Sequence, residues 1–171
     1  MKPRVGISGC LLGDEVRYDG THKRADDVLA LFGDEVEWVP VCPEVEVGMG
    51  TPREPIALMA HPDGVRSGHE RVLLVGVTSG EDWTERMRTW ARDCVGALRA
   101  LNLSGFILKA RSPSCGVQGV AIESAPTTGR GLFAQALVEA LPDLPVEDEE
   151  RLKDPGVRDA FLQRVRAVRK P

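Results

Sequence analysis

The stretch RVGISGCLLG, residues 4–13, sets the expected fold of this 171-residue chain. Residues 4–8 are a short β-branched run that predicts a buried strand, and the Gly-bounded segment after them predicts a tight loop. Cys10 therefore follows the carboxyl end of a strand directly. The arrangement recurs twice: a strand predicted over 36–41 is followed by Cys42, and one predicted over 105–110 leads through a loop to Cys115.

The remaining elements alternate between helix and strand. Helical spacing of apolar residues predicts helices over 22–32, 83–101 and 132–141, with a charged amphipathic helix from Pro155 to about 168. Strands are predicted over 71–77 and 144–146, whereas the many Gly and Pro residues of 45–68 predict a long ordered loop. The alternation predicts a single α/β domain with a mostly parallel sheet over residues 1–150, and a C-terminal helix within 151–171 packed on it.

Length and charge exclude several classes of protein. A chain of this size removes about 70% of its unfolded surface on folding, so it needs neither disulfides nor a metal simply to stay folded. The formal net charge of -4 argues against a nucleic acid polymer as the main partner. No window approaches the roughly 18 apolar residues of a membrane span, and the first residues lack a signal-peptide core. We therefore expect a cytoplasmic protein without a membrane partner.

The four cysteines fall into two groups: Cys94 lies within a predicted helix, and the other three follow predicted strands. Cys94 lies on the apolar face of the helix predicted over 83–101, where packing explains it. Cys10, Cys42 and Cys115 each follow a strand, and the carboxyl ends of parallel strands share one sheet edge where ligands bind. Three thiolates there could hold a zinc ion with an open position or a 4Fe-4S cluster with one iron lacking a protein ligand. Sequence spacing alone does not separate these two.

Three blocks around these cysteines resemble the thiouracil desulfidase family, also known as domain of unknown function 523. They are SGCLLGDEVRYDGTHK (residues 8–23), VCPEVEVGMGTPR (41–53) and LKARSPSCG (108–116), and the resemblance extends over most of the chain to about Val146. It implies a Rossmann-like domain with a 4Fe-4S cluster on Cys10, Cys42 and Cys115. It also implies an enzyme that desulfurates thiolated nucleobases such as 2- or 4-thiouracil, releasing sulfide without net redox change.

Hydrolytic loss of sulfur requires a group that accepts a proton from water. Glu44, two residues after Cys42, is the candidate general base, and the resemblance points to the same glutamate and to Ser112 as catalytic residues. Ser114 is the weaker alternative to Ser112 and a candidate substrate contact. Other candidate substrate contacts follow the first strand: Arg17, Tyr18 and Lys23.

Two other functions use the same loops. A zinc or thiol hydrolase would be colourless yet active, and an iron-sulfur redox sensor would hold a cluster without desulfurating anything. The expected partner of the enzyme is a small thionated molecule, and neither its identity nor the oligomeric state of the protein follows from the sequence.

Overall fold

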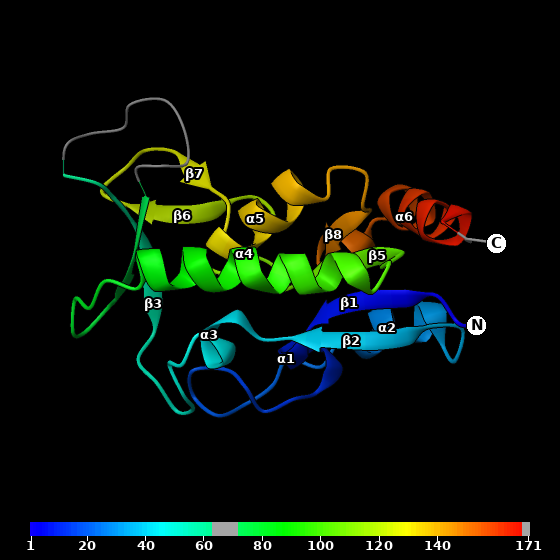
Figure 1. Ribbon diagram of the computed structural model, residues 1–171, viewed down its shortest axis with the longest axis horizontal. Helices are drawn as coiled ribbons and strands as arrows, with labels where there is room; N and C mark the ends of the chain where they lie inside the picture. Colours follow the sequence, from blue (N-terminus) through cyan, green and yellow to red (C-terminus); the bar gives the residue numbers. More distant parts are fainter. Residues whose placement is uncertain (63–71, 169–171) are drawn as a thin grey trace.

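A computed structural model describes residues 1–62 and 72–168 of the chain. Strands and helices are interspersed along it (Figure 1), with two runs of consecutive strands, β3-β4 and β5-β6-β7. The elements are β1 (Arg4–Ser8), α1 (Gly9–Leu12), α2 (Asp26–Phe32), β2 (Glu37–Val41), α3 (Pro43–Glu46), β3 (Ile56–Ala60), β4 (Val72–Gly76), α4 (Thr84–Ala100), β5 (Gly105–Leu108), β6 (Val120–Glu123), β7 (Thr128–Gly129), α5 (Leu132–Ala140), β8 (Val146–Asp148), the short 3-10 helix η2 (Arg151–Lys153) and α6 (Pro155–Ala167).

One sheet is entirely parallel, with strand order β2-β1-β5-β8. Its register pairs Ser8 with Val41 and Ile7 with Ile107, so β1, β2 and β5 end at the same edge. This confirms the predicted mostly parallel α/β sheet. Pro40 lies in β2, an edge strand, where its missing N–H leaves no gap between strands.

Helices cover both faces of this sheet, and the side-chain alternation of the strands divides its residues between two cores. Ile7 and Ile107 lie in a cluster with Phe32 of α2 and Phe161 of α6. Neighbouring strand residues face the other way: Phe106 joins the cluster that α4 and α5 form. The continuous apolar runs of the sequence therefore reflect a sheet buried on both faces.

The second sheet departs from the sequence-based expectation. Its order is β4-β3-β6-β7, and only β3 and β6 are parallel. The strand predicted over 71–77 thus belongs to this mixed sheet. β3 lies within 45–68, which we expected to be a loop throughout, because Pro55 and Pro62 flank the IALMA run instead of interrupting it. Residues 63–68 of that loop lie outside the described residues.

Smaller differences concern where elements begin and end. Helix α2 begins at Asp26 instead of residue 22, and β8 begins at Val146 instead of residue 144. A single helical turn, α1, follows β1 where a tight loop was expected, and a second one, α3, follows β2 and overlaps the start of the predicted long loop. The strands β6 and β7 were not predicted, because both are short and polar on one side.

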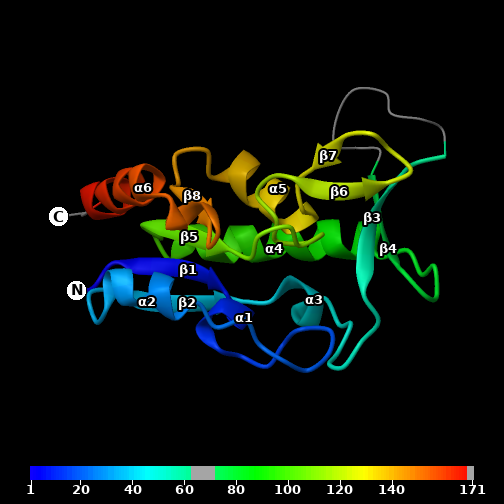
Figure 2. The same cartoon turned by 180° about the vertical axis from the view of Figure 1, so that it is seen from behind.

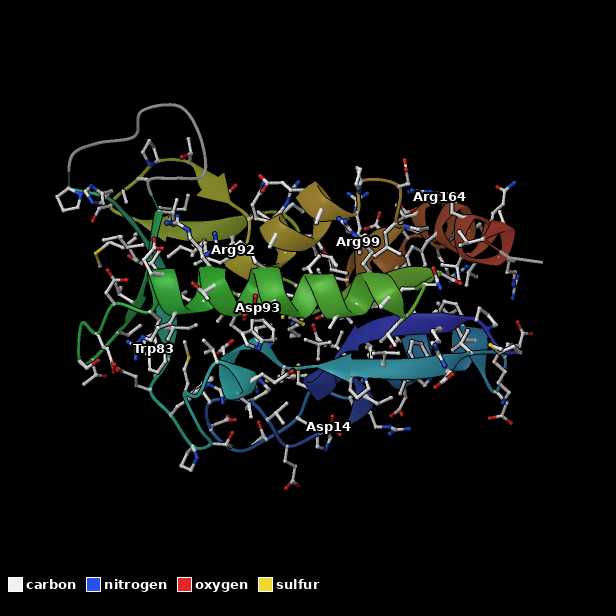
Figure 3. The ribbon with its side chains drawn as sticks, in the orientation of Figure 1. Asp14, Trp83, Arg92, Asp93, Arg99 and Arg164 are labelled. Atoms are coloured by element: carbon white, nitrogen blue, oxygen red, sulfur yellow. The ribbon has the colours of Figure 1, made fainter. Side chains whose placement is uncertain are left out.

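The long helix α4 runs lengthwise along the molecule, from the end where β3 lies to the end where β5 lies (Figures 1 and 2). Arg92 and Arg99 point to its α5 side and Asp93 to its α3 side (Figure 3). The predicted C-terminal helix begins after Asp154, whose carboxylate accepts the N–H groups of Gly156 and Val157, and it buries Phe161 and Val165 against the first core. Within the described residues, every helix is too short or too polar to cross a membrane.

Candidate functional site

A cavity of about 390 Å³ opens where β1, β2 and β5 end. It has the size of a small-molecule site and lies at the edge of the parallel sheet where α/β proteins bind ligands. All nine residues singled out from the sequence line it: Cys10, Arg17, Tyr18, Lys23, Cys42, Glu44, Ser112, Ser114 and Cys115. The lining residues also include Arg53 and Lys109, discussed below.

The strand ends position the three cysteines. Cys10 and Cys42 follow β1 and β2 within two residues, and Cys115 lies in the loop between β5 and β6. All three are free thiols, and Cys10 and Cys115 are buried. Burial raises the pKa of Cys10 to about 11 and also raises the pKa of Cys42 and Cys115. Each of these thiols also lies within electrostatic range of another of the three, which raises the pKa of Cys10 and Cys115 further.

Cys94 is separate from this group. It lies on α4, is absent from the cavity lining and packs against the cluster around Phe106. Burial alone accounts for most of the rise of its pKa to about 12. The expectation that Cys94 serves packing agrees with this position.

Three thiols could hold either a single metal ion or a 4Fe-4S cluster, and the two differ in the geometry that they require. Among the described residues, no three His, Cys, Asp or Glu side chains converge as the ligands of a single ion do. The ligands of a 4Fe-4S cluster need not converge on one point, because each cysteine binds a different iron atom. The chemistry of Cys10, Cys42 and Cys115, three soft thiol donors around one cavity, fits a 4Fe-4S cluster.

Glu44 lies on the single-turn helix α3, two residues after Cys42. Its two oxygens have different partners: Oε1 accepts from Nε of Arg53 at 3.1 Å, and Oε2 accepts from the hydroxyl of Ser114 at 2.8 Å. The side chain is 17% exposed. A carboxylate with one oxygen neutralised and the other shared with a hydroxyl is suited to exchange protons at the cavity wall.

Each serine hydroxyl has one hydrogen to donate, and this determines the direction of the hydrogen bonds around Ser112 and Ser114. The N–H groups of Ser114 and Cys115 both donate to Oγ of Ser112, at 3.2 and 3.0 Å. Ser114 has one hydroxyl hydrogen, which it donates to Glu44, so the contact of 3.0 Å between the two serines has Ser112 as donor. The chain therefore runs from Ser112 through Ser114 to Glu44, and Ser114, ranked second from the sequence, makes the direct contact.

Of the four residues expected to contact substrate, Ser114 is buried in the cavity wall, and the other three, Arg17, Tyr18 and Lys23, line the same cavity. Tyr18 is exposed, and the Arg17 guanidinium lies 5.5 Å from the centre of its ring. Lys23 is exposed, and its backbone N–H donates to the carbonyl of Cys10. Their positions allow them to meet a ligand as it enters.

Three features of the site were not assigned a function from the sequence. Arg53 is one, with a side chain only 6% exposed. A second is the pair of Lys109 and Glu149, with Nζ and Oε1 2.5 Å apart, in which Glu149 also accepts the N–H of Ala110 at 2.7 Å. The third is Gly131, packed against the backbone of Ser114 and Cys115. For Arg53, Lys109 and Gly131 a signal existed, since all three lie in segments that resemble the family.

Comparisons with known proteins give concordant results. A model of the family described as 2-thiouracil desulfurase matches residues 5–149. The uncharacterised protein YbbK of Bacillus subtilis (strain 168) is 34% identical over 138 residues, which cover 78% of this chain and 89% of the relative. The solved structure of the 4Fe-4S-dependent thiouracil desulfidase TudS superimposes with a TM-score of 0.65 at 28% identity, covering 94% of this chain and 99% of that one. The chain therefore belongs to the 2-thiouracil desulfurase family.

Proposed function

We propose that this protein is a desulfidase that removes sulfur from a thiolated nucleobase such as 2- or 4-thiouracil by hydrolysis on a 4Fe-4S cluster. The observation that carries the proposal is one cavity lined by three free thiols on adjacent strand ends together with a carboxylate and two hydroxyls. The name of the family and the cluster dependence printed for TudS support it.

The cluster ligands in this proposal are Cys10, Cys42 and Cys115, which leave one iron without a protein ligand. When bound, the cluster would supply a Lewis acid with affinity for the sulfur of the substrate. Lys109 lies in electrostatic range of Cys10 and offsets negative charge there, while Glu149 fixes its ammonium group.

The remaining chemistry belongs to water and to the side chains of the cavity. Replacing sulfur by oxygen requires water to attack the thione carbon, the C–S bond to break and sulfide to leave, with no electron gained or lost. Glu44 takes the proton of the attacking water, directly or through Ser114, and returns it to the departing sulfur or a ring nitrogen. Ser112 fixes the loop that carries Ser114 and Cys115.

The same arrangement supports proposals about substrate contact and compartment. Tyr18 offers an aromatic ring to a planar base, while Arg17 and Lys23 offer positive charge at the entrance. The partner is a small thionated molecule and not a nucleic acid polymer or a membrane. The reducing cytoplasm is the proposed location, because it keeps the free thiols available to a cluster.

The test is to reconstitute the protein without oxygen, measure iron and acid-labile sulfide, and follow sulfide and uracil released from 2- and 4-thiouracil. About four iron atoms per chain with stoichiometric sulfide and uracil support the proposal. An active but iron-free protein would establish a zinc or thiol hydrolase instead. A loaded cluster without turnover on any thionated base would establish the redox sensor.

A further inference from the structure

Arg53 lines the cavity with a charged side chain that is only 6% exposed and that the proposed chemistry does not use. Its guanidinium donates to Oε1 of Glu44, to the carbonyl of Val16 at 2.8 Å and to the carbonyl of Gly50 at 2.8 Å. It also approaches Oγ1 of Thr51 at 3.3 Å. These four acceptors hold the planar guanidinium group in one orientation.

The guanidinium group of Arg53 makes the two carboxylate oxygens of Glu44 differ in their hydrogen-bond partners. Oε1 accepts from the Nε–H group of Arg53, which has only donors, whereas Oε2 faces the hydroxyl of Ser114, which can donate or accept. Arg53 therefore holds Oε1, and Oε2 is the oxygen turned to the serines.

The guanidinium group of Arg53 also connects Glu44 to the loop that contains Val16 and Tyr18. The carbonyl of Val16 accepts both from Arg53 and, at 3.8 Å, from the thiol of Cys42, and the backbone N–H of Arg53 donates to the carbonyl of Tyr18. One side chain thus fixes the carboxylate relative to the loop that lines the entrance of the cavity.

We propose that Arg53 is a positioning residue for the reaction: it holds Glu44 in the orientation that presents Oε2 to Ser114 and to the reacting water. This inference rests on the proposed desulfidase activity. Arg53 touches neither substrate nor cluster in this assignment, and it acts only through Glu44. A misplaced general base lowers the rate of the chemical step more than it weakens substrate binding.

The test compares Arg53→Met, Arg53→Lys and Glu44→Gln in reconstituted protein, with iron content and thermal unfolding midpoint measured beside kcat and KM. We expect Arg53→Met to lower kcat by about a hundredfold while KM changes less than about threefold. Arg53→Lys should recover part of the lost kcat, because lysine keeps the positive charge but lacks the planar guanidinium group. In the Glu44→Gln background, Arg53→Met has no further effect on kcat, since the group on which it acts is gone.

The control is Arg4→Met, which removes an exposed ion pair with Glu37 outside the cavity lining and leaves kcat unchanged. The inference is overturned if Arg53→Met keeps kcat, if both Arg53 variants lose iron and turnover alike, or if the Glu44 and Arg53 effects multiply. If Arg53→Met does not fold, Arg53→Lys alone and combined with Glu44→Gln gives the same cycle. A wild-type protein without desulfidase activity would instead refute the proposed function, which distinguishes the two failures.

Discussion

The hydroxyl of Ser114 donates a hydrogen bond of 2.8 Å to Oε2 of Glu44, although seventy residues separate them in the chain. The serine is completely buried. It reaches the carboxylate because the loop after β5 and the helical turn after β2 meet at the same edge of the parallel sheet. The contact joins two motifs whose relationship cannot be read from their separation in sequence.

Removing this hydroxyl should impair turnover more than cluster binding. We expect Ser114→Ala to lower kcat about tenfold to a hundredfold, since a hydrogen bond to a charged group is worth about 1.5–3 kcal/mol. Ser112→Ala should lower both kcat and iron content, because Oγ of Ser112 accepts the N–H of Cys115. Steady-state kinetics with iron analysis separates the two variants, and an unaltered kcat in Ser114→Ala would contradict the direct role of Ser114.

The cysteines should separate by iron content. Replacing Cys10, Cys42 or Cys115 by Ala removes one of the three thiols that line the cavity, so each variant should lose the cluster and the turnover. Cys94→Ala is the matched control, because Cys94 packs on α4 away from the cavity, and it should keep both. The measurement is iron and visible absorption after anaerobic reconstitution. Equal losses in all four variants would refute this ligand assignment.

The convergence of Cys10, Cys42 and Cys115 was predictable because it depends only on topology. Parallel strands end at one edge, so residues that follow three adjacent strands must meet whatever their distance in sequence. The second sheet was not predictable in this way. β3 pairs with β6, and this pairing is decided by tertiary contacts that a local pattern of Gly and Pro does not report.

The side-chain contacts within the site lie further beyond sequence reasoning. Ser112 and Ser114 have the same chemistry and differ only in the direction that the loop around Pro113 gives their hydroxyls. Arg53 reaches Glu44 because the chain turns back after α3, and a cation in a loop gives no local signal of burial. Sequence therefore identified the residues of the cavity but not which hydroxyl and which cation contact the carboxylate.

The start of α4 should contribute stability that depends on pH. The carboxylate of Asp82 accepts the N–H of Thr84 at 2.8 Å, and hydrogen bonds from Thr84 hold the pKa of Asp82 below its ordinary value. Because the pKa of Asp82 is lower in the folded protein than in the unfolded chain, its carboxylate stabilises the folded protein at pH values above the pKa of the unfolded chain. This contribution disappears as the pH falls through the pKa of the folded protein. Asp82→Ala should cost about 1 kcal/mol at neutral pH, as the loss of a helix cap does.

This difference between wild type and Asp82→Ala should close as the pH falls below the ordinary carboxyl pKa and through the lower pKa of Asp82 in the folded protein. Urea unfolding followed by circular dichroism across that range measures it, with Asp143→Ala as a control, because the side chain of Asp143 makes no hydrogen bond that caps α4. A difference that stays constant into acid would mean that packing around residue 82, and not its ionised carboxylate, supplies the stability.

Gly131, just before α5, should tolerate no side chain. A Cβ atom there would lie 2.5 Å from the carbonyl carbon and oxygen of Ser114 and 2.8 Å from the nitrogen of Cys115. These are backbone atoms of the cysteine loop, which also receives the first N–H groups of α5: those of Phe133 and Ala134 donate to the carbonyl of Ser114 at 3.0 and 3.1 Å. Gly131→Ala should therefore push the loop away from the helix, cost about 1–3 kcal/mol of unfolding free energy and lower the iron content.

Gly96 provides the matched control for this change. It lies in α4, and an added Cβ would meet nothing within 4 Å, so Gly96→Ala should stabilise the protein by about 0.5–1 kcal/mol through helix propensity and leave the iron content unchanged. Denaturant unfolding of both variants, with iron analysis after reconstitution, gives changes of opposite sign if close packing of α5 on the loop holds Cys115 in place. If Gly131→Ala is as stable and as rich in iron as the wild type, then Cys115 is held by the loop's own hydrogen bonds to Ser112 and the contact with α5 is dispensable.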